Sequence, residues 1–358
     1  MDKKDLRFSQ NLIRWYELNK RDLPWRLTKD PYRIWLSEVI LQQTRVNQGM
    51  DYYLRFVDAF PTVEALAEAE EDKVLKLWQG LGYYSRARNL HSAAKEIQAK
   101  YKGVFPREHG EVLGLKGIGE YTAAAIVSIA YGMPYATVDG NVYRVLSRVF
   151  GVAEAIDSTE GKKIFAQLAQ DLLDDRHPGQ HNQAVMELGA LQCVPVSPDC
   201  SVCPLLEMCI AYSEQTVTKL PVKQGKVKTR KRYFNYLDIR YENSLYLSKR
   251  GKGDIWEGLY ELALIETSES LDLESLMQTT EFKQMFAKAK IMKIDQRMKE
   301  VKHVLSHQQI FAKFYKIELD LELEYVGNRM QLISLDELSN YAVSRLVDRY
   351  FETELAQE

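Results

Sequence analysis

The feature that most restricts the fold of this chain is a group of four cysteines within one short segment. The segment CVPVSPDCSVCPLLEMC contains all four cysteines, Cys193, Cys200, Cys203 and Cys209, with the spacing C-x6-C-x2-C-x5-C. In a cytosolic chain such closely spaced thiols are rarely disulfides and are typical of tetrahedral zinc or of an iron–sulfur cluster. The spacing leaves zinc and iron–sulfur open and disfavours four free structural cysteines.

Length, charge and the N-terminus limit the class of protein. A chain of 358 residues suggests two or three domains. The start MDKKDLRFSQ lacks the apolar core and cleavage site of an export signal, and no apolar run reaches the roughly 18 residues that span a bilayer. We therefore expect a cytoplasmic protein. Because the formal net charge is only −2, any DNA-binding surface must be a local patch.

One segment is strongly basic. Between Gln215 and Leu237 there is no acidic residue, whereas the segment contains Lys219, Lys223, Lys226, Lys228, Arg230, Lys231 and Arg232. It lacks apolar periodicity, which is typical of a linker. The linker is either a solvated connector or a connector that also contacts phosphates.

The two sides of this segment differ in their hydrophobic period. Apolar residues recur at three- and four-residue spacing before it, and the expected helices are Phe8–Asn19, Ile34–Phe60, Val63–Ala69, Asp72–Trp78, Arg86–Tyr101, Tyr121–Tyr131, Asn141–Phe150 and Lys162–Leu173. After it, we expect a hairpin of Tyr233–Tyr241 and Leu245–Lys249, one or two strands in Val301–Leu319 and a helix over Asp336–Glu354. We predict an all-helical region (1–212), a linker (213–232) and a smaller α+β domain (233–358).

The sequence LKGIG, Leu115–Gly119, predicts a tight turn between two helices. Gly117 and Gly119 allow positive φ and leave room for a close approach. Because the next helix begins at once, its free N–H groups can bind a backbone phosphate, and Lys116 lies in the same turn. An ordinary helix end followed by a new helix is the alternative.

Two carboxylates are predicted to have opposite surroundings. Asp139 precedes a helix that starts near Asn141, where backbone amides and the helix dipole favour the anion; an ordinary N-cap is the alternative. Glu38 lies in IWLSEVIL, where three of its four helical neighbours are apolar, so burial should raise its pKa; a boundary residue that reaches water is the alternative. A raised and a lowered pKa together are typical of an acid paired with an anionic stabiliser.

The chain resembles the helix-hairpin-helix DNA glycosylases that carry an iron–sulfur cluster. The resemblance rests on three features that occur in this order: LKGIG, VDGNVYRV and the cysteine spacing. That family has an endonuclease III branch and a branch of adenine glycosylases of the MutY type. The endonuclease III branch is known for a lysine two residues after the second hairpin glycine, where this chain has Tyr121, which cannot form an imine. Because LPWR, SEVILQQTRV and GLGYYSRARNL also resemble the adenine glycosylases, the chain is identified as a member of that branch.

The resemblance implies a [4Fe–4S] cluster on the four cysteines. It also implies an enzyme of base excision repair that flips out and hydrolytically removes adenine opposite 8-oxoguanine or guanine. Glu38 would protonate the adenine and later help to activate water, and Asp139 would stabilise the oxocarbenium-like sugar. Further implied site residues are Tyr121, Asn141 and Arg26 around the chemistry, and Gln43, Leu81 and Tyr83 on the DNA. Taken alone, Tyr83 would be a packing residue.

The C-terminal domain resembles the Nudix-related domain that recognises 8-oxoguanine in this family. GDIWEGLYELALIE is similar to the Nudix segment Gly-x-Trp-Glu-x-Pro, but no RE-x-x-EE run follows Gly258, so we expect no pyrophosphate hydrolysis. Relatives contact the lesion with a Phe-Ser-His turn, which is Leu305, Ser306 and His307 here. We expect the polar pair to bind the lesion without the ring contact; a strand-end histidine is the alternative for His307.

The resemblance also sets expectations about partners. We expect a monomer, associated with the nucleoid and not with a membrane, that acts on double-stranded DNA with A:8-oxoG or A:G mispairs; repair or replication protein partners stay open. The loop VPVSPD lacks the basic residues common in relatives, so its contact with phosphate should be weak. The alternatives are an endonuclease III-type glycosylase/AP lyase, disfavoured by Tyr121, and a non-enzymatic DNA-damage-binding protein, disfavoured by the presence of both Glu38 and Asp139.

Overall fold

The computed structural model describes residues 3–225, 229–323 and 330–356, and it divides into two compact units. The helical unit comprises Met1–Glu68 and Asn89–Gly225. The sheet unit comprises Ala69–Arg88 and Lys226–Glu358. A stretch inside the predicted helical region therefore belongs with the C-terminal part of the chain.

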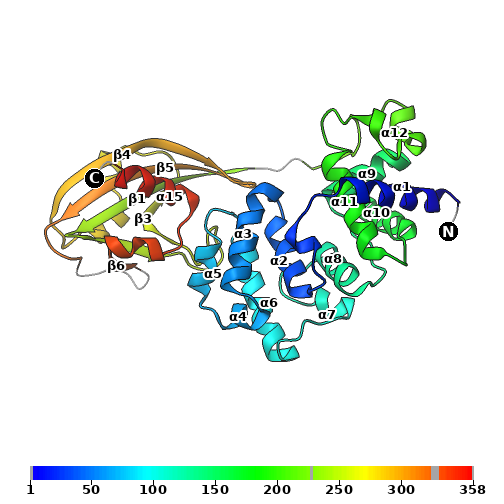
Figure 1. Ribbon diagram of the computed structural model, residues 1–358. Helices are drawn as coiled ribbons and strands as arrows, with labels where there is room; N and C mark the ends of the chain where they lie inside the picture. The colour runs from blue at the N-terminus through cyan, green and yellow to red at the C-terminus, as the bar shows by residue number, and fades with distance from the viewer. Residues whose placement is uncertain (1–2, 226–228, 324–329, 357–358) are drawn as a thin grey trace. The chain divides into compact units, whose positions relative to one another are not determined.

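The helical unit is built from short and medium-length helices (Figure 1). The helices are α1 (Lys3–Asn19), α2 (Pro31–Leu41), α3 (Val46–Ala59), α4 (Val63–Glu68), α6 (Ser85–Tyr101, which starts in the sheet unit), α7 (His109–Leu113), α8 (Glu120–Tyr131), α9 (Gly140–Phe150), α10 (Thr159–Leu172), α11 (Pro178–Leu191) and α12 (Ile210–Ser213). Single 3-10 turns are η1 (Pro24–Arg26), η2 (Cys200–Val202) and η3 (Leu206–Met208). The all-helical prediction for this part is confirmed.

The prediction of one helix over Ile34–Phe60 is wrong. The chain leaves the helix between α2 and α3, where Gln43 has a φ of 57°. A residue in this left-handed region cannot continue a right-handed helix. The apolar spacing continues on both sides of the break and therefore concealed it.

Two helix clusters form the core of the helical unit. The apolar faces of α1, α9, α10 and α11 meet around residues such as Phe8, Leu146, Phe165 and Leu188. Helix α8 is buried from Thr122 to Ile129 and packs against α2, α7 and α11. Its alanines allow this close packing, which fixes the start of α8 relative to α2 and α11.

The sheet unit contains one six-stranded mixed sheet. Its elements are α5 (Glu71–Leu77), β1 (Arg230–Tyr241), β2 (Ser244–Lys249), β3 (Tyr260–Thr267), α13 (Leu273–Met277), α14 (Thr280–Met285), β4 (Ile291–Val304), β5 (Gln308–Leu319), β6 (Met330–Ser334), η4 (Leu335–Asn340) and α15 (Arg345–Leu355). The strand order is β4-β5-β1-β3-β2-β6, with β1 parallel to β5 and antiparallel to β3.

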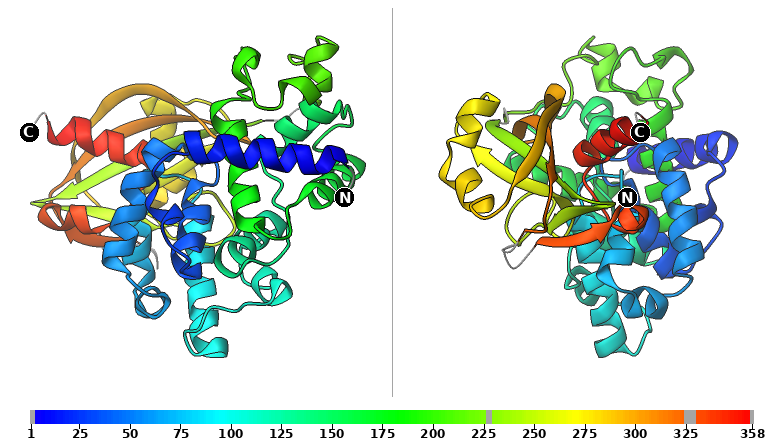
Figure 2. Two further views of the ribbon diagram at one scale, coloured as in Figure 1. Left: turned by 45° about the vertical axis from the view of Figure 1, so that its right-hand side comes forward. Right: turned by 90° about the vertical axis from the view of Figure 1, so that its left-hand side faces the viewer.

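Both faces of the sheet are covered. Alternate residues such as Phe234 and Tyr236 pack under α15, whereas Leu237 and Ile239 pack under α13 and α14. Figure 2 shows these helices on opposite sides of the strands. Because successive side chains of a strand point to opposite faces, a sheet with two covered faces needs apolar residues at both sets of positions.

The α+β prediction for this part is confirmed, with differences in detail. The hairpin of β1 and β2 is present, and Val301–Leu319 contains the end of β4 and all of β5. Strand β3 was not predicted. The prediction of one helix over Asp336–Glu354 is wrong, because Ala342 and Val343 are extended beside Tyr260 and separate η4 from α15.

The stretch Ala69–Arg88 is bonded to the rest of the sheet unit by polar contacts. Asp72 accepts from Lys249 Nζ at 2.5 Å and from Tyr260 Oη at 2.9 Å. Gln79 Nε2 donates to Asp348 Oδ1 at 3.0 Å. Since such contacts depend on side-chain partners far apart in sequence, hydrophobic periodicity could not have predicted this grouping.

Among the helices of the described residues, none combines the length and apolar character that crossing a membrane requires.

Candidate active site

A buried carboxyl group and a tyrosine meet between α2 and α8. Tyr121, the second residue of α8, donates from Oη to Glu38 Oε2 at 2.7 Å. The Tyr121 hydroxyl also lies 3.2 Å from Met186 Sδ. Because the single phenol proton points to Glu38 Oε2, the other oxygen of the carboxyl group is left to carry an acidic proton.

The surroundings of Glu38 favour its neutral form. Burial raises the pKa of Glu38 to about 7, and the nearby charge of Asp139 adds to this rise. The hydrogen bond from Tyr121 and the charge of Arg26 act in the opposite direction and lower the pKa. The rise expected from the apolar neighbours of Glu38 is therefore present. A carboxyl group with such a pKa is protonated in a large fraction of molecules near neutral pH, as a general acid must be.

Asp139 is the N-cap of α9. Its Oδ1 accepts from the backbone N–H groups of Asn141 at 2.9 Å and Val142 at 2.8 Å, and its Oδ2 accepts from Asn141 Nδ2 at 2.9 Å. The prediction that its pKa is lowered is wrong: burial raises the pKa of Asp139, and these three bonds oppose the rise without cancelling it. The sequence showed the donors of the cap but not the depth of the site.

A chain of hydrogen bonds holds Asn141 in turn. Arg144 Nη2 donates to Asn141 Oδ1 at 2.8 Å and to Gly189 O at 2.7 Å, and Arg144 Nε donates to Cys193 O at 2.7 Å. An added Cβ on Gly189 would lie 2.6 Å from Asn141 Cβ, so α11 can approach α9 here only with glycine. The Asp139 carboxyl group is thereby connected to the segment that carries the first cysteine.

A second buried glutamate escaped the sequence analysis. Glu187 on α11 accepts from both terminal nitrogens of Arg26, at 2.8 and 2.7 Å, and from Arg21 Nη2 at 2.5 Å. Burial alone would raise the pKa of Glu187, but these hydrogen bonds outweigh burial and lower the pKa to about 2. The signal that singled out Glu38 was available here as well, because three of its helical neighbours, Ala184, Ala190 and Leu191, are apolar.

The turn before α8 has the predicted backbone form at one glycine only. Gly117 has a φ of 79°, and an added Cβ would lie 2.6 Å from Asn89 Cβ. Gly119 is extended, with a φ of −103°, and an added Cβ would have no atom within 4 Å. Lys116 is exposed. The side of the turn at Gly119 is therefore open, which leaves the N–H groups at the start of α8 accessible.

The four cysteines line one cavity of the helical unit, together with apolar side chains such as Val145, Val149 and Leu205. Arg148 Nη1 lies 3.4 Å from Cys193 Sγ and donates to Val194 O at 2.8 Å. Burial raises the pKa of the Cys203 thiol to about 11. Four soft donors and one nearby cation suit a thiolate-bound metal group, whose positive charge would offset the cost of burying ionised thiols.

The remaining predicted site residues divide between the two units. Gln43 is exposed in the helical unit. In the sheet unit a cleft is lined by residues that include Tyr83, Arg88, Trp256, His303, Ser306 and His307. Tyr83 Oη and Ser306 Oγ lie 2.6 Å apart. Tyr83, a predicted DNA contact, and Ser306 and His307, the predicted contacts to the lesion, are thus neighbours.

Comparisons with known proteins decide the family. A model described as HhH-GPD superfamily base excision DNA repair protein matches residues 36–171, and one described as NUDIX domain matches residues 235–353. The adenine DNA glycosylase of Buchnera aphidicola subsp. Acyrthosiphon pisum (strain APS) is 37% identical to this chain, covering 71% of it and 73% of that protein. That of Buchnera aphidicola subsp. Baizongia pistaciae (strain Bp) is 33% identical, covering 85% and 84%. The chain belongs to the adenine DNA glycosylase family.

Solved structures support the same fold for the helical part. A thermostable thymine-DNA glycosylase superposes with a TM-score of 0.55 at 29% identity, covering 59% of this chain and 98% of that one. A non-covalent endonuclease III–DNA complex superposes with a TM-score of 0.52 at 21% identity, covering 60% and 98%. The predicted fold class, a helix-hairpin-helix region followed by a Nudix-like domain, is confirmed.

In this member of the adenine DNA glycosylase family, the structure corrects one predicted DNA contact, Leu81, and one residue of the predicted linker, Arg232. Leu81 is only 6% exposed, so its side chain packs inside the sheet unit and cannot contact DNA. Arg232, assigned to the basic linker, lies in β1 and is paired with Asp254 and Glu266, both at 2.6 Å. Its charge is satisfied inside the protein, so Arg232 is no phosphate ligand. Lys226 and Lys228 lie outside the described residues.

The start of the predicted linker is attached to the helical unit. Asp157 accepts from the backbone N–H groups of Gln224 at 2.9 Å and Gly225 at 2.8 Å. Leu220 O accepts from Arg148 Nε at 3.1 Å. The chain up to Gly225 therefore follows the surface of the helical unit instead of forming a free connector.

Proposed function

We propose that this chain removes adenine from A:8-oxoG and A:G mispairs in double-stranded DNA by acid-assisted hydrolysis of the N-glycosidic bond. Membership of the adenine DNA glycosylase family supports adenine excision in base excision repair. The observation that carries the proposal is the buried carboxyl group of Glu38, which accepts from Tyr121 Oη at 2.7 Å and whose pKa burial and the charge of Asp139 raise to about 7.

The two carboxyl groups divide the chemistry. Glu38 gives the proton on its free oxygen to the adenine ring, so that the base leaves nearly neutral, while Tyr121 holds the other oxygen. Asp139, fixed by three hydrogen bonds, faces the positive charge that develops on the sugar. Water then adds to the sugar, with Glu38, now ionised, as the base that activates it.

Tyr121, two residues after the second hairpin glycine, supports hydrolysis without strand cleavage. Tyr121 occupies the position of the lyase lysine and is committed to Glu38, so no amine is present there to form a Schiff base. A single-turnover assay on duplexes with adenine opposite 8-oxoguanine, with and without alkali, tests this. A monofunctional glycosylase cleaves the strand only after alkali, a glycosylase/lyase cleaves without it, and a damage-binding protein yields no cleavage in either case.

The pH dependence should report both carboxyl groups. Since Glu38 must be protonated, the single-turnover rate at low enzyme concentration should fall as pH rises through about 7. Since Asp139 must be ionised and its pKa is raised, the decline at low pH should begin above the usual range of an aspartate. A rate that is flat between pH 6 and 9 would contradict the assignment of Glu38 as the acid.

We propose that Cys193, Cys200, Cys203 and Cys209 hold a [4Fe–4S] cluster, each thiolate binding one iron. The shared cavity and the adjacent Arg148 support this, because a cluster with four thiolates is anionic. When bound, the cluster supplies cross-links between the end of α11, η2 and the start of α12.

Purified under anaerobic conditions, the protein should be brown and contain about four irons per chain. Cys200→Ser should lose iron and DNA affinity, whereas Ser201→Ala, one residue away, should keep both. Stoichiometric zinc without iron would contradict the cluster.

We propose that Lys116 and the N–H groups that follow Gly119 at the start of α8 bind a backbone phosphate, in a turn whose shape depends on the positive φ of Gly117. Gln43 and Tyr83 would enter the duplex beside the lesion, and Ser306 and His307 would contact 8-oxoguanine in the opposite strand. The exposure of all these side chains supports this assignment. Leu305 packs against the sheet core and leaves the two polar residues at the tip of the β4–β5 turn.

Ser306→Ala combined with His307→Ala should lower the preference for 8-oxoguanine over guanine roughly tenfold, since each base contact is worth about 1–3 kcal/mol. The maximal rate on saturating substrate should not change, because neither residue touches the adenine. The measurement is the ratio of single-turnover rates on the two mispairs at low enzyme concentration. Ser270→Ala in the same unit is the control, and an unchanged ratio in the double variant would refute the lesion-reading role.

A further inference from the structure

The loop between α5 and α6 has an unusual backbone. Gly80, Gly82 and Tyr83 have φ values of 92°, 78° and 49°. Glycine adopts such angles without steric cost, but a tyrosine stays there only when its surroundings hold it. An added Cβ on Gly82 would meet nothing within 4 Å, so the backbone angle, not space, requires glycine. Something must therefore fix the Gly82–Tyr83 peptide.

Two side chains hold this peptide by its oxygen. Gly82 O accepts from Trp78 Nε1 at 3.0 Å and from Arg86 Nη2 at 3.2 Å. The next carbonyl, Tyr83 O, accepts from the Arg86 backbone N–H at 2.9 Å. Because a peptide unit is planar, fixing its oxygen also fixes the direction in which the chain enters Tyr83.

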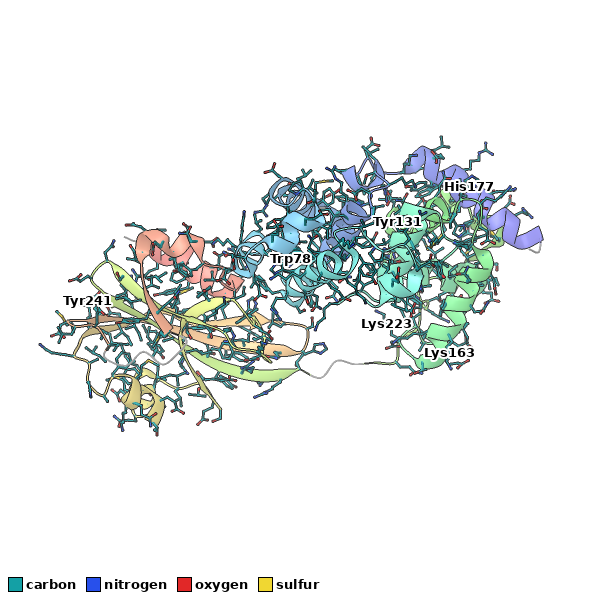
Figure 3. The ribbon with its side chains drawn as sticks, turned by 90° about the horizontal axis from the view of Figure 1, so that it is seen from below. Trp78, Tyr131, Lys163, His177, Lys223 and Tyr241 are labelled. Atoms are coloured by element: carbon teal, nitrogen blue, oxygen red, sulfur yellow. The ribbon has the colours of Figure 1, made fainter. Side chains whose placement is uncertain are left out.

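The same two side chains reach the Tyr83 ring. Arg86 Cζ lies 5.1 Å from the centre of the Trp78 ring and 5.6 Å from that of Tyr83. Trp78, labelled in Figure 3, is fully buried, whereas Tyr83 is 48% exposed. Burial lowers the pKa of Arg86 to about 10, which leaves it charged at neutral pH. A desolvated cation over an aromatic face is held more strongly than an exposed one.

We propose that Trp78 and Arg86 are positioning residues for Tyr83, which set the direction of its ring before DNA binds. The inference rests on the proposed function, in which Tyr83 enters the duplex. A ring that is already fixed loses less conformational freedom when it enters the duplex. Replacing Trp78 or Arg86 should therefore lower the affinity for DNA and change the mispair preference. The adenine-releasing step lies elsewhere, so the maximal rate is unaffected.

The position of the ring can be measured without DNA. With 3-fluorotyrosine placed at position 83 of the full-length protein, its 19F resonance should be single and narrow. Trp78→Phe keeps a buried ring without the N–H donor, and Arg86→Met keeps the stem without the cation. Both should shift, broaden or split the line, while Arg86→Lys, which restores the cation, should have a smaller effect.

The matched control is Arg107→Lys, which alters a guanidinium 5.1 Å from the Tyr131 ring and should leave the line unchanged. A wild-type line in both Trp78→Phe and Arg86→Met would overturn the proposal. Melting temperatures identify any variant that fails to fold, and whichever of Trp78→Phe and Arg86→Met folds then provides the test.

A double-mutant cycle tests whether the effect passes through Tyr83. At low enzyme concentration, Trp78→Phe and Arg86→Met should each lower the single-turnover rate roughly fivefold, and neither should lower it further in a Tyr83→Ala background. Additive losses would overturn the proposal. If Tyr83→Ala alone kept the wild-type rate, the proposed role of Tyr83 in DNA would fail instead, and the 19F result would still decide the positioning.

Discussion

Glu38→Gln is expected to abolish adenine release while DNA binding is retained. Glutamine has the shape of the neutral acid and still accepts the Tyr121 hydrogen bond at its carbonyl oxygen, but it has no acidic proton to give. Loss of a general acid typically costs about 10²–10⁴-fold in rate. The measurement is single-turnover adenine release from an A:8-oxoG duplex, with the affinity for the same duplex measured in parallel.

The control is Glu160→Gln, the same substitution at an exposed position of α10, which should leave the rate unchanged. Retention of more than about a tenth of the wild-type rate in Glu38→Gln would remove Glu38 from the role of acid, because that loss lies below the range for a general acid.

Asp139→Asn should be almost as damaging, for a different reason. Asparagine is a good N-cap and can keep the two backbone bonds at the start of α9, so the fold should be preserved. What disappears is the negative charge that we propose faces the developing positive charge of the sugar. Removing one preorganised electrostatic group typically costs about 10²–10³-fold, measured as the maximal single-turnover rate.

Asp157 offers a matched comparison, because it also accepts two consecutive backbone N–H groups. The two aspartates differ in burial: hydrogen bonds from Gln224 and Gly225 lower the pKa of the exposed Asp157, whereas burial raises that of Asp139. Asp157→Asn should therefore leave the maximal rate unchanged. Equal losses in the two variants would mean that the cap, not the charge of Asp139, matters.

This pair of aspartates also shows where sequence reasoning ended. Residue order revealed which amides would bond Asp139, since a cap is local. It could not reveal the depth of the site, which depends on how α2, α8 and α11 pack around it. The raised pKa of Glu38 was predictable because the apolar residues around it lie on its own helix.

Other features were likewise predictable from the sequence only where their cause lies within a short segment. The cysteine spacing, the glycine turn and the hairpin of β1 and β2 are each contained in a few consecutive residues. The pairing of Arg26 with Glu187 and that of Arg232 with Glu266 join residues far apart in sequence. Charge counting placed Arg232 in a basic linker, whereas the fold pairs it with acidic side chains.

The chain passes between its two units at three points, after Glu68, Arg88 and Gly225. A protease that cut within the segment after Gly225 would divide the polypeptide, yet the C-terminal fragment would still bind Asp72 and Gln79 of the N-terminal fragment. The nicked protein would behave as a complex of two fragments with its own dissociation constant. Substitutions in Ala69–Arg88 would then weaken fragment association, although this stretch lies within the residues that match the glycosylase family model.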